Sequence, residues 1–306
     1  MNPLSRKPAR LITCAAAAGM AALAIAACGG SSSAGTSTSS TKASSAAPKI
    51  SAVASLEAML PSSVKKSGVL TVGLSPNFAP YEYVASGGAI VGSEVDLARA
   101  TAAKLGLKAQ FIQSNFAGLL TGLAAGRFDV ILSGMNDTPS REGQVTFVNY
   151  TNLANNILMS STNAENYKNT LSLCGMVAGE TLGTTFPGNV KSFSKACVAA
   201  HKPPIKLQLF DTSNDVVTAL AANRVGFEYQ VTGSNDYEAK LSNGELATVG
   251  EPQESLPTGY VITKTDTKLV SAIYAAVNNL MSTGELNTVM SKWGQEKEMF
   301  SKATIN

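Results

Sequence analysis

The sequence predicts an α/β fold built as two lobes, each with a parallel sheet covered by helices. Strands and helices alternate in two runs, one between residues 69 and 133 and one between residues 176 and 241. Strands separated by helices form βαβ units, and these give a parallel sheet with helices on its faces. A strand and two helices follow the second run and need a place to pack. We therefore expect the chain to cross between the lobes more than once.

The first run opens with a strand and a turn-rich segment. A helix is predicted from Ser93, because Ser93 and Asp96 have the spacing of a capping box and apolar residues recur at helical intervals until Gly106. The other elements of this run are a strand at Val69–Leu74, a strand at Ala109–Gln113, a helix at Phe116–Ala125 and a strand at Asp129–Ser133.

The second run repeats this plan. Its strands are expected at Met176–Glu180, Ile205–Phe210 and Val225–Gln230, and its helices at Pro187–Ala200, Ser213–Asn223 and Asn235–Leu241. The chain then returns through a strand at Tyr260–Thr263 and ends in helices at Thr267–Thr283 and Leu286–Trp293.

Residues 1–27 have the pattern of a secretory signal. Three basic residues precede the apolar stretch Leu11–Ala27, which is shorter than the ~20 residues that a bilayer span needs. The tetrapeptide Ile25-Ala26-Ala27-Cys28 resembles the bacterial lipobox, whose cysteine is acylated and becomes the mature N-terminus. We expect a lipid-anchored protein at the outer face of the cell membrane. A plain transmembrane anchor is the alternative.

Residues 28–66 are expected to be the lipidated cysteine and a flexible tether. Residues 29–49 are rich in Ser, Thr, Ala and Gly and are too polar and repetitive to bury a core. Removal of the signal takes three of the 24 basic residues and none of the 21 acidic ones, so the mature chain is formally neutral. A neutral chain without a basic stripe argues against a nucleic-acid partner.

Two cysteines remain in the mature chain beyond the lipidation site. Cys174 and Cys197 form an even pair in an oxidising location, which favours a disulfide over two buried free thiols. Neither has a neighbour at a metal-binding spacing, so no metal site is expected.

Six segments occur in an order and spacing that identify a family. They are Leu70–Tyr83, Val91–Leu97, Ala125–Arg141, Leu182–Thr185, Ala219–Val225 and Gly284–Gly294. Together they resemble family 3 of the bacterial extracellular solute-binding proteins, the polar amino-acid receptors of ABC importers. The placement of Cys174 and Cys197 is similar to that in members from high-GC Gram-positive bacteria.

The resemblance implies a periplasmic-binding-protein-like type II fold, with two αβ lobes joined by a two-crossover hinge. Residues 67–155 and 258–306 would form the larger lobe and residues 156–257 the smaller one, with crossovers near Asn152–Leu158 and Pro257–Val261. Such receptors close over a small ligand and then dock on a membrane permease. We accordingly expect a monomer that binds a small carboxylate, partners an ABC permease and needs no cofactor.

The resemblance also implies a ligand site between the lobes. Arg141 would clamp the ligand's carboxylate, because a planar guanidinium matches a carboxylate bidentately. Ser133, Gly134 and Asn136, at the preceding strand end, would share that carboxylate. An arginine on a solvated helical turn is the alternative.

Further candidates surround this carboxylate position. Phe78 and Phe116 correspond to aromatic positions that sandwich the ligand's carbon skeleton, with ordinary core packing as the alternative. Thr184 and Thr185 lie at a helix start, where free amides favour an anion, with simple helix capping as the alternative. Two polar residues complete the set, Thr181 near the ligand's far end and Gln230.

Two positions depart from the family pattern. Relatives that bind α-amino acids hold the ammonium with acids where this chain has Val231 and Ser75. A buried ammonium without a carboxylate is costly, so the ligand could be an unusual amino acid, an N-modified derivative or another small carboxylate. Three acids are possible substitutes, namely Glu82, Asp137 and Glu228.

The rival functions are a dehydratase-like enzyme on the same fold and a non-transport sensory lipoprotein. The single histidine, His201, precedes Lys202-Pro203-Pro204 in a predicted exposed loop, and no nucleophile elbow or phosphate loop is present. We therefore expect no catalytic residue and no enzymatic activity.

Overall fold

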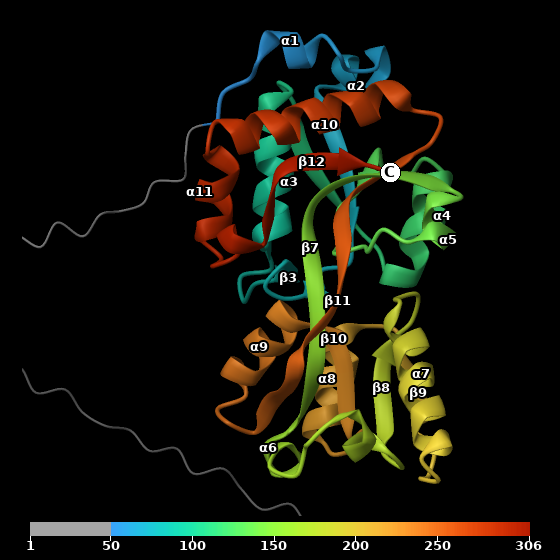
Figure 1. Ribbon diagram of the computed structural model, residues 1–306. Coiled ribbons are helices and arrows are strands. Elements are labelled where there is room, and N and C mark those ends of the chain that lie inside the picture. The colour runs from blue at the N-terminus through green and yellow to red at the C-terminus, as the bar shows by residue number, and fades with distance from the viewer. Residues whose placement is uncertain (1–49) are drawn as a thin grey trace, which may run out of the picture. The chain divides into compact units, whose positions relative to one another are not determined.

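The computed structural model describes residues 50–306 (Figure 1). The expected signal and the lipidation site Cys28 lie outside the described residues. One large sheet has the strand order β5-β1-β6-β11-β7-β10-β8-β9, with β12 paired to β7. Its strands are β1 (Val69–Leu74), β5 (Lys108–Gln113), β6 (Val130–Ile131), β7 (Val145–Ser160), β8 (Val177–Thr181), β9 (Lys206–Phe210), β10 (Phe227–Val231), β11 (Leu246–Thr263) and β12 (Met299–Ile305). A small second sheet contains β2 (Asn77–Phe78), β3 (Glu82–Val84) and β4 (Ile90–Val91).

Helices cover the large sheet and confirm the predicted α/β class. The α-helices are α1 (Ala54–Glu57), α2 (Ser62–Ser67), α3 (Ser93–Lys104), α4 (Leu119–Ala124), α5 (Pro139–Glu142), α6 (Ser161–Ala164), α7 (Phe186–Ala199), α8 (Ser213–Ala221), α9 (Thr232–Leu241), α10 (Thr267–Ser282) and α11 (Glu285–Ser291). Short 3₁₀ helices lie at η1 (Phe116–Gly118), η2 (Thr170–Leu173) and η3 (Glu296–Glu298).

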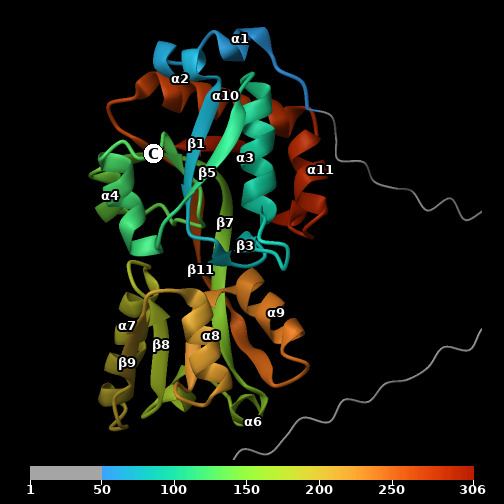
Figure 2. The same ribbon diagram turned by 180° about the vertical axis from the view of Figure 1, so that it is seen from behind.

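The elements form an upper and a lower group in Figures 1 and 2. In the upper group β1 pairs in parallel with β5 and β6, and in the lower group β8 pairs in parallel with β9 and β10. Both groups therefore contain the expected parallel pairing. The antiparallel strands β7 and β11 run through both groups and join them.

Sequence reading identified only the last four residues of β11 as a strand and did not identify β7. The predicted crossovers, near Asn152–Leu158 and Pro257–Val261, lie within these two strands. The β7–β11 ladder is irregular between Val249 and Leu256 and again after Thr258. The boundaries of the two lobes stay a prediction.

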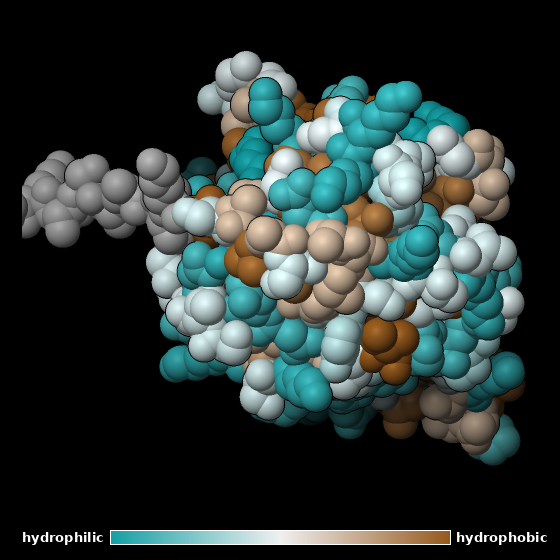
Figure 3. Space-filling model, turned by 90° about the horizontal axis from the view of Figure 1, so that it is seen from above, coloured by the Kyte–Doolittle hydropathy of each residue, from teal (hydrophilic) through white to brown (hydrophobic). Residues whose placement is uncertain are grey.

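The upper group is built around an apolar core that α10 covers. Leu269, Ile273, Val277 and Leu280 recur at helical spacing on α10 and are all buried. On the outer face above this core, hydrophilic residues surround small apolar patches (Figure 3). A separate core, with Ile157 and Phe227 among its members, lies in the lower group.

The C-terminal part of the predicted tether is folded, which corrects its boundary at residue 66. Leu56 on α1, Leu60 between the two helices and Val64 on α2 are buried against the upper core. Burial of these apolar side chains stabilises the folded segment.

The predicted capping box at Ser93 is wrong. The N-cap of α3 is Gly92, which has a φ of 140°, and Ser93 is the first helical residue, with its hydroxyl buried and unpartnered. A Cβ at residue 92 would lie 2.0 Å from the carbonyl oxygen of Tyr81, so only glycine fits there.

Candidate functional site

A pocket lies where the strand ends and helix starts of the upper and lower groups meet. Its empty volume is about 430 Å³, a figure that includes its opening to solvent. Carboxyl ends of parallel strands are the usual binding edge of α/β sheets. Nine of the ten predicted ligand-binding residues line the pocket: Phe78, Phe116, Ser133, Gly134, Asn136, Arg141, Thr181, Thr184 and Gln230.

Arg141 connects the two groups across this pocket. It lies on α5, and its guanidinium donates from Nη1 to the carbonyl of Asn136 at 2.8 Å and from Nη2 to the carbonyl of Gly183 at 3.0 Å. The residue is only 8% exposed, which contradicts the solvated-turn alternative. Burial lowers the pKa of Arg141 to about 10, while the nearby Asp137 opposes this shift. The guanidinium therefore stays charged at neutral pH.

The two predicted aromatic residues form walls of the pocket. The Phe78 ring stacks on Tyr81 with centroids 4.7 Å apart, and the Arg141 guanidinium carbon lies 5.8 Å from the centre of the Phe116 ring. Gly134 lets Phe78 approach, because a Cβ there would lie 2.4 Å from that ring. The two rings thus give the pocket apolar surface beside a buried cation.

The hydroxyls of the three predicted threonines of the lower group differ in their hydrogen-bond partners. Thr184 donates to the carbonyl of Thr181 at 2.7 Å, so its hydroxyl supports the turn before α7. Thr185 does not line the pocket but donates to Oδ1 of Asn136 at 3.4 Å, which connects the two groups. Thr181 is buried with an unpartnered hydroxyl, which leaves that hydroxyl available to a ligand.

The polar end of the pocket includes residues that sequence reasoning missed. Gln230 donates from Nε2 to Oγ of Ser213 at 3.0 Å and to Oε1 of Glu228 at 2.9 Å. The amide of Ser213 donates to Oδ1 of Asn77 at 3.3 Å. Ser213 begins α8, and Asn77 lies in the turn-rich segment after β1. Both positions could therefore have been found from the sequence, as a predicted helix start and a predicted turn. Phe186, directly after Thr185, is the third missed lining residue.

The two departures from the family pattern lie in different surroundings. Val231 is 2% exposed and packs in the lower core, while Ser75 lines the pocket. Of the possible substitutes, Asp137 accepts from Asn149 and Asn306, and Glu228 lies behind Gln230. None of the proposed substitutes lines the pocket.

Two buried glutamates support the strand end that carries Ser133 and Gly134. Ser133 donates to Oε1 of Glu82 at 2.7 Å, and the amide of Gly134 donates to Oε2 of Glu94 at 2.7 Å. Burial, reinforced by the neighbouring Glu94, raises the pKa of Glu82 well above its ordinary value. Burial also raises the pKa of Glu94, against hydrogen bonds from Tyr150 and Gly134 that lower it.

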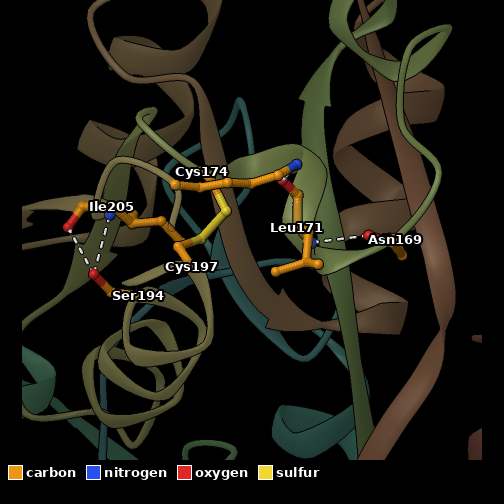
Figure 4. Close-up of a disulfide and its surroundings, with 7 residues drawn as sticks. Asn169, Leu171, Cys174, Ser194, Cys197 and Ile205 are labelled. Carbon is orange, nitrogen blue, oxygen red and sulfur yellow. Dashed lines mark hydrogen bonds between the residues drawn. A yellow bond between two sulfur atoms is a disulfide. The ribbon is translucent and has the colours of Figure 1, made fainter. Parts of the chain in front are cut away.

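Cys174 and Cys197 are disulfide-bonded in the lower group, with Cα atoms 5.6 Å apart. Figure 4 shows the bond joining the segment after η2 to α7, next to a pair of hydrogen bonds between Ser194 and Ile205. Neither cysteine lines the pocket. The disulfide therefore holds the frame of the lower group and does not contact the ligand position.

Residues 50–306 hold no cluster of three or more His, Cys, Asp or Glu side chains placed to bind a metal ion. His201 is exposed at the end of α7, far along the helix from the pocket-lining Phe186. Within the same residues, no helix combines the length and apolar character needed to cross a membrane.

The chain belongs to the bacterial extracellular solute-binding proteins, family 3, whose family model matches residues 70–296. It is 29% identical over 255 residues to the arginine-binding protein ArgT of Corynebacterium glutamicum, covering 83% of each chain.

Two solved structures are similar to this one. An ancestral arginine-binding protein bound to arginine has a TM-score of 0.69 and 28% identity, covering 74% of this chain and 98% of its own. The ancestral amino acid-binding protein AncCDT-1, a precursor of cyclohexadienyl dehydratase, has a TM-score of 0.69 and 26% identity, covering 76% and 97%. These neighbours confirm the predicted type II fold.

Proposed function

We propose that this chain is the substrate-binding lipoprotein of an ABC importer, which captures a small carboxylate and delivers it to a membrane permease. The observation that carries the proposal is the buried guanidinium of Arg141 in a pocket between two groups of elements. A cation held inside a pocket is stabilised by an anionic partner, and its planar donors suit a carboxylate. Anchoring through Cys28 rests on the lipobox-like sequence before it.

The relatives support a binding role. ArgT is named as an arginine-binding protein, and an ancestral neighbour was solved with bound arginine. A related protein of Haemophilus influenzae is described as a probable amino-acid ABC transporter-binding protein. Delivery to a permease is the step that this proposal adds for the present chain.

Arg141→Ala tests the carboxylate clamp. We expect ligand affinity to fall at least about 100-fold, because the substitution leaves a buried carboxylate unpaired, at a cost of ~3–5 kcal/mol. Calorimetry with a panel of small carboxylates would measure the change. Arg224→Ala is the matched control, since Arg224 is exposed and outside the pocket. Equal affinities for the two variants would refute the clamp.

The similarity to AncCDT-1 makes a dehydratase the second candidate function. An enzyme of that kind needs a proton donor or acceptor facing the substrate. Among the described lining residues no carboxyl or imidazole group is present, since Glu82, Glu94 and Glu228 lie behind them. Recovery of a bound carboxylate unchanged after incubation would favour the receptor, whereas a dehydrated product would favour the enzyme.

A further inference from the structure

The pocket has an unbalanced charge. Among its lining residues within residues 50–306, Arg141 is the only charged side chain. The other polar lining residues carry neutral hydroxyls and amides, among them Ser75, Asn77, Thr181, Ser213 and Gln230. A monoanion balances this site, whereas a zwitterion would bring a second cation into it.

The acids near the pocket do not supply a charge to its lining. Asp137, near Arg141, accepts hydrogen bonds from Asn149 and Asn306, and neither Asp137 nor Glu228 lines the pocket. Glu228 is 1% exposed and is separated from the pocket by Gln230, whose amide donates to it. Burial and then the neighbouring Glu238 raise the pKa of Glu228 well above its ordinary value. One of its carboxyl oxygens has no hydrogen-bond partner among the described residues.

The position that follows Gln230 on β10 is apolar. Val231 is 2% exposed and contributes to the core of the lower group. An ammonium group beside the ligand carboxylate would therefore meet neutral partners only. Ionic groups without a counter-charge are poorly tolerated in such a desolvated place.

The same neutral lining suits a hydroxyl, carbonyl or amide. The Gln230 amide and the Ser213 hydroxyl are held in place by their mutual hydrogen bond, and Thr181 has a free buried hydroxyl. A neutral polar substituent can exchange hydrogen bonds with these groups at no electrostatic penalty.

We infer that the pocket selects a small monocarboxylate whose substituent next to the carboxylate is neutral, namely a 2-hydroxy acid, a 2-oxo acid or an N-acylated amino acid, over the free amino acid. This inference rests on the proposed carboxylate-binding function. It sets the chain apart from relatives that are named for binding arginine, a ligand with cationic groups of its own.

A matched ligand series on the full, unaltered chain tests the inference. Alanine, leucine, glutamine and phenylalanine are each compared with their 2-hydroxy and N-acetyl counterparts by calorimetry. We expect at least one neutral counterpart to bind 10-fold or more tightly than its parent amino acid. Equal or tighter binding of every free amino acid, still lost in Arg141→Ala, would overturn the inference while leaving the proposed function intact.

Ser75→Asp tests the same inference from the protein side, because Ser75 lines the pocket and is the other position where relatives carry an acid. A carboxylate at this position should improve the affinity for the free amino acids at least 10-fold, whereas the uncharged, isosteric Ser75→Asn should not. If both variants gain equally, charge is not the selecting property and the inference fails. If Ser75→Asp does not fold, the ligand series on the unaltered chain decides alone. Failure of every carboxylate in that series to bind would reject the site and the inference together.

Discussion

At the scale of single residues, the site depends on groups that lie behind it. Glu82 and Glu94 are buried side by side beneath Ser133 and Gly134, which line the pocket. Two acids in one buried place cannot both ionise cheaply. The protonated form of Glu82 is therefore the one that the fold stabilises.

This pair makes stability depend on pH in a definite direction. An unfolded Glu82 loses its proton near its ordinary pKa of 4.5, while the folded one holds it to higher pH. In between, the unfolded state binds fewer protons, so the free energy of unfolding falls as pH rises. We expect Glu82→Gln to raise the Tm at pH 8 by about 2–4 °C, equivalent to roughly 1 kcal/mol, and to change it little at pH 4.5.

Thermal melts at both pH values would measure this effect. Glu165→Gln is the control, since Glu165 is exposed on the surface. An equal effect of Glu82→Gln at the two pH values would show that the buried carboxyl does not hold its proton.

At the scale of elements, the disulfide fixes the segment after η2 to α7. Cys174 and Cys197 are separated by 23 positions, and closing a loop of that size stabilises a fold by about 3 kcal/mol in the chain-entropy model. Because the bond lies away from the pocket, its loss should lower the Tm and leave ligand affinity within about 2-fold. The double variant Cys174→Ala, Cys197→Ala measures both quantities.

Reductant provides the control for that variant. It should lower the Tm of the unaltered chain and have no effect on the double variant. A large loss of affinity in the double variant at a temperature where it is folded would mean that the bond shapes the site itself.

Elements with strong local signals were the ones that the sequence predicted well. Helix α10 was predicted within one residue of its observed ends, because its apolar stripe and flanking residues mark it clearly. The capping box at Ser93 failed because a tight approach to Tyr81 makes Gly92 the cap, and a contact over that distance leaves no local pattern. Strand β7 was missed because its partners β10, β11 and β12 come from three later parts of the chain.

The pocket was predictable for a different reason. Nine predicted residues converge on it because family motifs place them at strand ends, where topology brings them together. Ser213 and Asn77 were missed since their role comes from a contact between the two groups of elements, 136 residues apart in sequence.

At the scale of the whole molecule, the approach of the two groups depends on a glycine. Gly183 has a φ of 82°, and a Cβ there would lie 2.7 Å from the Cα of Ala117 across the pocket. Gly183→Ala should therefore prevent the close approach and weaken ligand binding at least about 10-fold, with fold stability reduced only by the backbone strain.

Gly175→Ala separates the effect of backbone strain from the effect of blocking the approach of the two groups. Gly175 has a nearly identical φ of 83°, but its added Cβ would meet only Pro203 at 3.4 Å. Both variants should lose similar stability, and only Gly183→Ala should lose affinity and show a larger radius of gyration by X-ray scattering with ligand. Identical affinities in the two variants would contradict a role for this approach in binding.

The two long strands β7 and β11 have a mechanical consequence. A movement of one group against the other must flex a continuous antiparallel ribbon, since the backbone ladder runs through the junction. Bending is easiest where the ladder is already interrupted, between Val249 and Leu256 and next to Thr258. The register of the main-chain ladder therefore sets how easily the upper group moves against the lower one. Side chains that line the pocket can change in evolution without altering that movement.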